Sequence, residues 1–190
     1  MRPTWILLDR DGTINVKAAE GHYISEPDQV RLLPGAGEAM RMLNEAGLPA
    51  VVVTNQRGVA LGRMMREDVD AVNRRVSGLV AEAGGKIDGY FVCPHDSGCA
   101  CRKPLPGLLS DAAETTGRSL LEAVLIGDSE SDVLAARAAS VPAILLNADR
   151  AVYSRAACVL PCLLDAVTHI LAVGGSTAVD GSLPTTWRLG

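Results

Sequence analysis

The chain alternates between short apolar runs and longer segments in which apolar residues recur every three or four positions. The short runs are rich in Val, Ile, Leu and Ala and predict buried strands at residues 5–8, 49–53, 89–92, 123–126, 142–146 and 158–160. The periodic segments predict helices at about 35–46, 66–83, 108–116, 130–139 and 162–173. Because strands alternate with helices, we expect an α/β fold, a three-layer Rossmann-like domain with a central parallel sheet.

The domain organisation follows from the length and from two biased segments. A chain of 190 residues fits one domain with a real core, which we place at residues 1–173. Residues 174–190 are rich in Gly, Ser and Thr and predict a mobile tail. The polar connection at 14–34 is longer than is usual between a strand and a helix, and such connections often act as lids or binding loops.

The composition argues against several classes of protein. Apolar residues make up 48% and charged residues 21%, which is typical of a globular protein. The net charge of -4 and the lack of a Lys/Arg-rich run argue against a nucleic-acid partner. No apolar run reaches the roughly 18 residues of a membrane span, and no signal segment precedes the first strand. We therefore expect a cytoplasmic protein with no membrane partner. We also expect a monomer.

Asp9 and Asp11 directly follow the first predicted strand and precede Gly12. Ligands of open α/β sheets bind at this end of the strands. Two carboxylates this close repel each other unless a cation lies between them, and Mg²⁺ prefers such oxygen ligands. One carboxylate could then attack phosphorus while the other protonates the leaving oxygen. The alternative is an ordinary Asx turn after a strand.

Two further polar clusters follow predicted strands. The Thr54 hydroxyl, with nearby backbone N–H groups, could hold a phosphoryl oxygen, or Thr54 could simply end its strand. Asp128 could complete an all-oxygen Mg²⁺ site with Asp9 and a backbone carbonyl near Asp11. Asp132 fits a helix-capping pair with Ser129 and could also help to position Asp128 without itself binding the metal. All these clusters fall on the same rim of the predicted sheet.

A cysteine- and histidine-rich loop carries the most specific local pattern. Its four candidate ligands lie within nine residues, and they are Cys93, His95, Cys99 and Cys101. A Cys₃His set fills all four positions of a tetrahedral zinc ion and leaves none for water, so we predict a structural Zn²⁺. Accidental clustering is the alternative. Arg102 and Lys103 follow the last ligand directly, and fixed cations of this kind suit a phosphate dianion.

In combination, these motifs resemble those of the haloacid dehalogenase superfamily of phosphotransferases. The resemblance covers residues 5 to about 147 and rests on Asp9-x-Asp11-Gly-Thr13, Thr54, Lys103, and Gly127-Asp128 with Asp132. The loop that ends in Cys-Arg-Lys-Pro, and Thr-Asn-Gln after the second strand, are similar to the branch of heptose-bisphosphate phosphatases and histidinol-phosphatase domains.

The resemblance implies a Mg²⁺-dependent phosphomonoester hydrolase without a separate cap domain. It makes Asp9 the nucleophile that forms an aspartyl-phosphate, and Asp11 the general acid and base. It assigns the phosphoryl group to Thr54 and Lys103, and Mg²⁺ to Asp9, the Asp11 carbonyl and Asp128. Asn55 and Arg102 are expected near the substrate.

The implied substrate is a small phosphorylated sugar, D-glycero-D-manno-heptose 1,7-bisphosphate, hydrolysed at C7. Histidinol phosphate or another small sugar phosphate is the alternative. A receiver-like signalling domain, which accepts a phosphoryl group on Asp, is a rival of another class, but the carboxylate of Asp11 supplies the acid and base needed for turnover. A zinc-stabilised binding protein without catalysis is a third possibility, against which the intact Asp9, Asp11, Lys103 and Asp128 argue.

Overall fold

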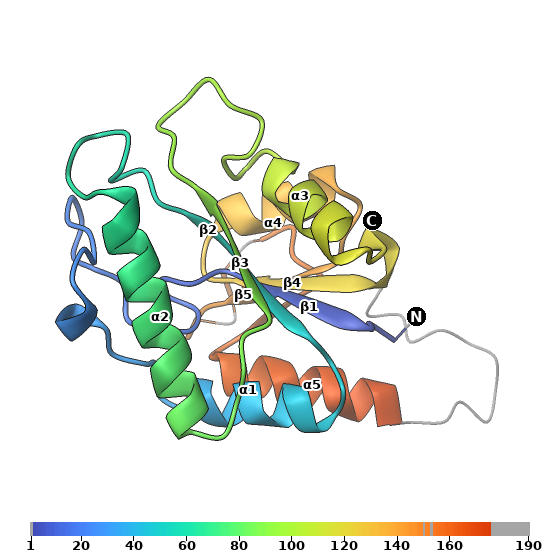
Figure 1. Ribbon diagram of the computed structural model, residues 1–190. Helices are drawn as coiled ribbons and strands as arrows, with labels where there is room; N and C mark the ends of the chain where they lie inside the picture. The colour runs from blue at the N-terminus through green and yellow to red at the C-terminus, as the bar shows by residue number, and fades with distance from the viewer. Residues whose placement is uncertain (1, 150, 153, 176–190) are drawn as a thin grey trace.

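Six parallel strands form one open sheet in the computed structural model, which describes residues 2–149, 151–152 and 154–175 (Figure 1). In chain order the strands are β1 (Trp5–Leu8), β2 (Ala50–Asn55), β3 (Gly89–Cys93), β4 (Ala123–Gly127), β5 (Ala143–Leu146) and β6 (Cys158–Leu160). Their order across the sheet is β3-β2-β1-β4-β5-β6, and every pairing is parallel.

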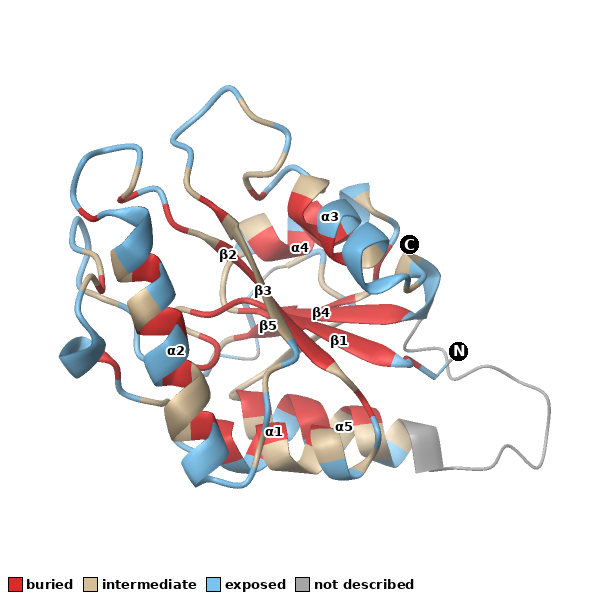
Figure 2. Cartoon of the chain, viewed as in Figure 1, coloured by how far each residue is buried: buried red, intermediate tan, exposed pale blue. Residues whose placement is uncertain are grey.

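Helices cover both faces of the sheet and divide the core in two. Side chains alternate between the faces of a strand, so Ile6 and Leu8 lie on one face of β1 and Trp5 and Leu7 on the other. The first face packs against α1 (Ala36–Glu45), α2 (Arg66–Glu82) and α5 (Leu163–Gly175). The second packs against α3 (Gly107–Thr116) and α4 (Glu130–Ala138). Figure 2 shows the central strands buried between these layers.

The predicted strands and helices are confirmed, with shifts of one or two residues at their ends. β2 continues to Asn55, because its last two residues pair with β3. The predicted tail at 174–190 begins inside α5, which ends at Gly175, and its remainder lies outside the described residues.

The connection at 14–34 is more ordered than its sequence indicates. The Val16 N–H donates to the Arg31 carbonyl at 2.9 Å, and the Leu33 N–H donates to Ile14 at 2.9 Å. A short 3₁₀ helix, η1 (Pro27–Gln29), lies between these paired ends, and a second, η2 (Leu120–Glu122), precedes β4. Backbone pairing between its two ends therefore fixes this segment beside the end of β1.

The strand order places a crevice beside β1. The chain runs from β1 outward through β2 to β3, and later returns to place β4 on the other side of β1. Ligands of open α/β sheets bind at such a point, beyond the carboxyl ends of the strands. Asp9 and Asp11 follow β1 there, and Asp128 follows β4.

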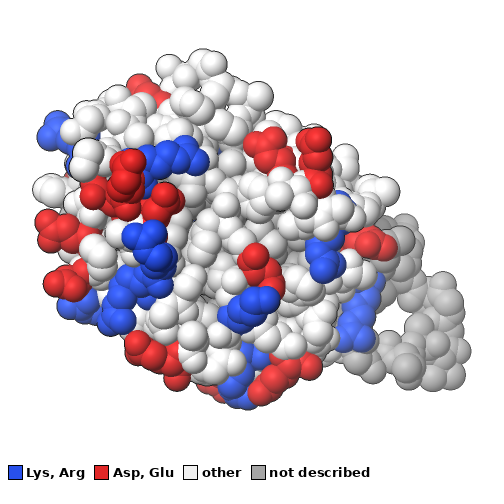
Figure 3. All heavy atoms as spheres, viewed as in Figure 1, with Lys and Arg blue, Asp and Glu red and all other residues white. Residues whose placement is uncertain are grey.

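The outer surface carries mixed charge. On the face shown in Figure 3, Lys and Arg side chains are interspersed with Asp and Glu side chains. Among the described residues, no helix combines the length and hydropathy that a bilayer crossing requires.

The placement of the core predicts that two leucines close in sequence contribute differently to the free energy of unfolding. Leu125 is fully buried on β4, so Leu125→Ala should lower the free energy of unfolding by about 3 kcal/mol through lost burial and a cavity. Leu121 in η2 is 72% exposed, and Leu121→Ala should change it by less than about 0.5 kcal/mol. Urea-induced unfolding measures both, and equal effects would contradict this placement of the core.

Candidate active site

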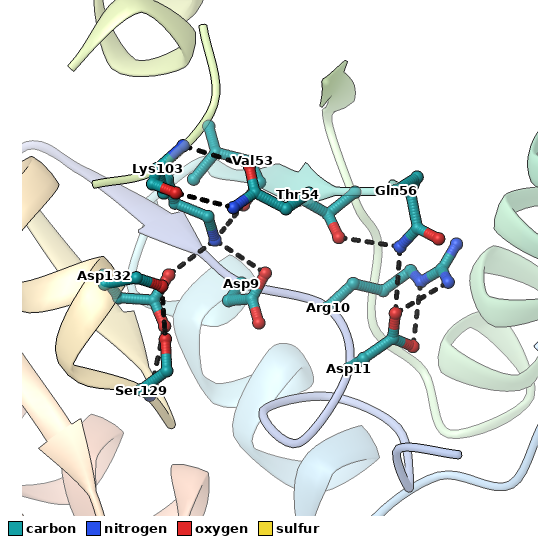
Figure 4. Close-up of polar contacts among 11 residues, drawn as sticks. Asp9, Arg10, Asp11, Val53, Thr54, Gln56, Lys103, Ser129 and Asp132 are labelled. Carbon is teal, nitrogen blue, oxygen red and sulfur yellow. Dashed lines mark hydrogen bonds and ion pairs between the residues drawn. The ribbon is translucent and has the colours of Figure 1, made fainter. Parts of the chain in front are cut away.

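Asp9 lies at the end of β1 and is fixed through both its backbone and its side chain. Its N–H donates to the Ile126 carbonyl at 2.9 Å, which continues the β1–β4 ladder by one residue. Its carboxylate oxygen Oδ1 accepts a hydrogen bond from Lys103 Nζ at 2.7 Å (Figure 4). The Asp9 residue is only 8% exposed. The carboxylate is thus held at the sheet edge with one oxygen bonded.

The Lys103 ammonium is buried and uses all three of its protons. It donates to Asp9, to Asp132 Oδ1 at 2.5 Å and to the Val53 carbonyl at 2.8 Å. Burial opposes the charge, but Asp9 and Asp132 outweigh burial and raise the pKa of Lys103 above its ordinary value. Burial raises the pKa of Asp9 to about 7, because the Lys103 charge offsets the loss of water only in part and the nearby Asp132 charge adds to the rise.

Asn55 fixes the backbone of Lys103. Its amide Nδ2 donates to the Lys103 carbonyl at 3.0 Å, and its Oδ1 accepts from the Lys103 N–H at 3.1 Å. The amide thereby links the end of β2 to the loop that carries Lys103. The observed contacts of Asn55 give it a positioning part, in addition to any contact with substrate.

Asp128 completes a group of carboxylates whose oxygens could hold a metal ion. One oxygen from each of Asp9, Asp128 and Asp132 lies within 4.8 Å of the others. Gly12 makes this approach possible, because a Cβ at Gly12 would lie 2.1 Å from Asp128 Oδ2, and its φ of +87° also favours glycine. A set of hard carboxylate oxygens fits Mg²⁺.

Asp132 is bonded to its neighbours on both oxygens. Oδ1 accepts from Lys103, and Oδ2 accepts from the N–H and the hydroxyl of Ser129 at 3.1 and 2.6 Å. The capping contact with Ser129 is as predicted from the sequence. Among the described residues, the hydrogen bonds of Asp132 join it to Lys103 and Ser129, so it supports Lys103 rather than Asp128.

Asp11 points away from Asp9, toward Arg10 and Gln56 (Figure 4). Its carboxylate accepts from Arg10 Nη2 at 2.9 Å, from Gln56 Nε2 at 2.9 Å and from Asn15 Nδ2 at 2.8 Å. Burial pulls the pKa of Asp11 upward, but the Arg10 charge and these hydrogen bonds outweigh it and hold the pKa below its usual value.

Arg10, Asn15 and Gln56 are site residues that the sequence reasoning missed. Arg10 is fully buried and also donates to Asn73 of α2 at 2.8 Å, a partner 63 positions away. Gln56 bridges Asp11 and the Thr54 hydroxyl, both at 2.9 Å. The one available signal was the polar run Thr54-Asn55-Gln56 at the carboxyl end of β2.

The Cys/His loop brings its four predicted ligands together. The distance from Cys93 Sγ is 3.7 Å to Cys99 Sγ, 3.7 Å to His95 Nδ1 and 3.1 Å to Cys101 Sγ. Zn–S bonds of about 2.3 Å in a tetrahedron imply S–S separations of about 3.8 Å. The donor set and most of its spacing therefore fit a structural zinc ion. Arg102 donates to the His95 carbonyl at 3.2 Å, so its guanidinium lies against this loop.

The Arg10–Asp11 pair predicts a pH-dependent loss of stability. A carboxyl with a lowered pKa stabilises the fold above its ordinary pKa of about 4, and this stabilisation is lost as the pH falls through the folded-state pKa. Arg10→Met should therefore lower the free energy of unfolding by about 2 kcal/mol at pH 7 and by less at pH 3.

Urea-induced unfolding at the two pH values measures this difference. As a control, Arg41→Met removes the exposed Arg41–Glu45 pair of α1 and should cost less than about 0.5 kcal/mol. Equal losses for Arg10→Met at both pH values would show that Arg10 acts through packing and not through the Asp11 charge.

Sequence comparisons with a family model and with individual proteins agree on the kind of protein that this chain resembles. Residues 4–140 match the family model of the haloacid dehalogenase-like hydrolases. The chain is 39% identical over 144 residues to D-glycero-beta-D-manno-heptose-1,7-bisphosphate 7-phosphatase of Rhodopseudomonas palustris, covering 71% of this chain and 78% of the relative. It is 41% identical over 133 residues to the corresponding alpha-anomer enzyme of Mycobacterium tuberculosis, covering 68% and 70%.

The fold agrees with the same assignment. The crystal structure of D,D-heptose 1,7-bisphosphate phosphatase from B. bronchiseptica, complexed with magnesium and phosphate, matches with a TM-score of 0.80. It is 32% identical, and the match covers 90% of this chain and 99% of that chain. The hydrolase match also sets aside the receiver-like and non-catalytic alternatives. This chain belongs to the haloacid dehalogenase-like hydrolases and is a phosphatase of that family.

Proposed function

We propose that the chain hydrolyses a phosphate monoester through an aspartyl-phosphate on Asp9. The observation that carries this proposal is the contact of Asp9 with Lys103 beside Asp128 at the end of β1. Asp9 Oδ1 is bonded to Lys103, whereas Oδ2 has no hydrogen-bond partner among the described residues, so we assign the attack on phosphorus to Oδ2. Lys103 and the Thr54 hydroxyl hold the phosphoryl oxygens.

Asp9, Asp128 and the Asp11 carbonyl would hold Mg²⁺, which supplies positive charge for the phosphoryl group. Support comes from the carboxylate cluster and from the structural relative that contains magnesium and phosphate. Asp132 contributes through Lys103, whose ammonium it keeps charged and in place.

Asp11 is the proposed general acid and then the base for water. In the observed orientation it is ionised, because Arg10 lowers its pKa. For the acid step the carboxyl must turn away from Arg10 and Gln56 toward the leaving oxygen, and its pKa rises as it leaves the guanidinium. The same two contacts are available to receive the ionised carboxylate after proton transfer.

The proposed substrate is D-glycero-D-manno-heptose 1,7-bisphosphate, with hydrolysis at C7. The curated relatives at 39% and 41% identity support this choice, and they act on the beta and the alpha anomer respectively. The assay below therefore needs the alpha and the beta anomer as separate substrates. We further propose that the protein acts in the cytoplasm as a monomer.

We also propose that Cys93, His95, Cys99 and Cys101 bind one structural Zn²⁺. The loop that they form leads directly into Arg102 and Lys103. It is joined to the loop after β2 by the Arg57–Asp96 ion pair at 2.6 Å and by the Ala60 N–H, which donates to the Pro94 carbonyl at 3.1 Å. A fixed zinc loop would thus shape the entrance to the site and place Arg102 at its edge.

Phosphate release tests the proposed function directly. With Mg²⁺, the protein should hydrolyse one heptose 1,7-bisphosphate anomer in preference to the other anomer, histidinol phosphate and common sugar monophosphates. Asp9→Asn should reduce turnover at least about 10⁴-fold with an unchanged fold, because an amide cannot replace the nucleophile.

Asp111→Asn, on an exposed position of α3, is the matched control and should leave turnover unchanged. Turnover by Asp9→Asn near the wild-type rate would remove Asp9 as the nucleophile. Hydrolysis of histidinol phosphate in preference to both heptose anomers would overturn the proposed substrate and leave the reaction type standing.

Elemental analysis tests the zinc site. The purified protein should contain about one zinc per chain, and Cys99→Ser should lose it, because thiolate ligands supply most of the binding. Cys158→Ser removes a thiol of β6, outside the cluster, and should retain the zinc. Wild-type protein purified without zinc, yet stable and fully active, would contradict the site.

A further inference from the structure

Lys17 places a second ammonium at the carboxylate cluster, and neither the family motifs nor the proposed mechanism uses it. Its Nζ lies 2.7 Å from Asp128 Oδ2, and Asp128 belongs to the group of carboxylates that could hold a metal ion. The Lys17 side chain is 66% exposed, whereas that of Asp128 is 12% exposed. An exposed cation therefore lies on a nearly buried carboxylate at the rim of the site.

The two lysines at the cluster are held very differently. Lys103 is 2% exposed and makes three hydrogen bonds. If its ammonium moved away, the buried carboxylates of Asp9 and Asp132 would lose their counter-charge. Lys17 is bonded to Asp128 alone among the described residues. When a divalent cation binds Asp128, it repels both ammonium groups, and Lys17 is the one that can move into solvent.

The backbone near Lys17 limits how far its ammonium can move. Two residues earlier, the side-chain amide of Asn15 donates to the Asp11 carboxylate at 2.8 Å. The Val16 N–H donates to the Arg31 carbonyl at 2.9 Å. The Cα of Lys17 therefore stays beside the site, and only its side chain is free to turn. A phosphorylated substrate that enters this crevice is the nearest large anion available to a displaced ammonium.

We propose that Lys17 is an exchangeable cation of this site: it neutralises Asp128 before the metal binds, and it binds the anionic substrate once the metal has displaced it. The inference rests on the proposed function for the identity of the substrate. An exchangeable Lys17 couples the two binding events, because metal binding releases the ammonium that the substrate then uses. Such coupling is reciprocal, so the substrate should also strengthen metal binding.

Calorimetric titration of the zinc-loaded protein with Mg²⁺, in the absence of any phosphate ester, tests the first half. Lys17→Met should tighten the Kd for Mg²⁺ about two- to fivefold, since an exposed competing ion pair is removed. Lys17→Arg keeps the charge and should stay near wild type. Lys86→Met is the matched control, because Lys86 pairs with Asp88 at 2.7 Å and is 73% exposed, and it precedes β3 at the other end of the sheet.

Steady-state kinetics at saturating Mg²⁺ tests the second half. Lys17→Met should raise KM for heptose 1,7-bisphosphate about fivefold with kcat within about twofold of wild type, and Lys17→Arg should restore KM. An unchanged Kd for Mg²⁺ in Lys17→Met would overturn the proposal, as would an unchanged KM. The Mg²⁺ titration needs no substrate, so a failure of the proposed function would be visible separately as a lack of phosphate release by the wild type.

Discussion

A lysine ammonium buried among protein atoms is stable only when each of its protons has an acceptor and its charge has a counter-charge. Lys103 meets this requirement with Asp9, Asp132 and the Val53 carbonyl, which lie directly after β1, in α4 and in β2. One cation thereby joins three elements of the domain and the Cys/His loop that carries it. The position of the Asp9 carboxylate depends on this contact.

The same constraint explains why two neighbouring carboxylates differ. Asp9 shares its cation with Asp132 and is buried, which raises its pKa, whereas Asp11 has Arg10 to itself and a lowered pKa. A nucleophile reacts as the carboxylate and a general acid as the carboxyl, so each proposed role needs a change of environment: a divalent cation at Asp9 would favour its ionised form, and Asp11 would have to turn away from Arg10. The difference between the two pKa values comes from the orientation of the side chains, which point to different partners (Figure 4).

The sequence was sufficient for the strands and for the approach of Asp9 to Asp128, because parallel strands bring their carboxyl ends to one edge. It was insufficient for Arg10. A charged residue between two aspartates is expected in solvent, and only the packing of α2 supplies its buried partner Asn73. The contact of Gln56 with Asp11 and the backbone pairing within residues 14–34 were missed for the same reason, since both join residues that are separated along the chain.

The strand order has a consequence for the synthesis of the protein. β1 is made first and lies in the middle of the sheet, but its partner β4 begins at Ala123. A growing chain can pair β1 with β2 early, yet Asp128 and Asp132 do not exist until most of the domain has been translated. Nascent chains shorter than 132 of the 190 residues therefore carry Asp9 without its complete set of partners and cannot yet form the site.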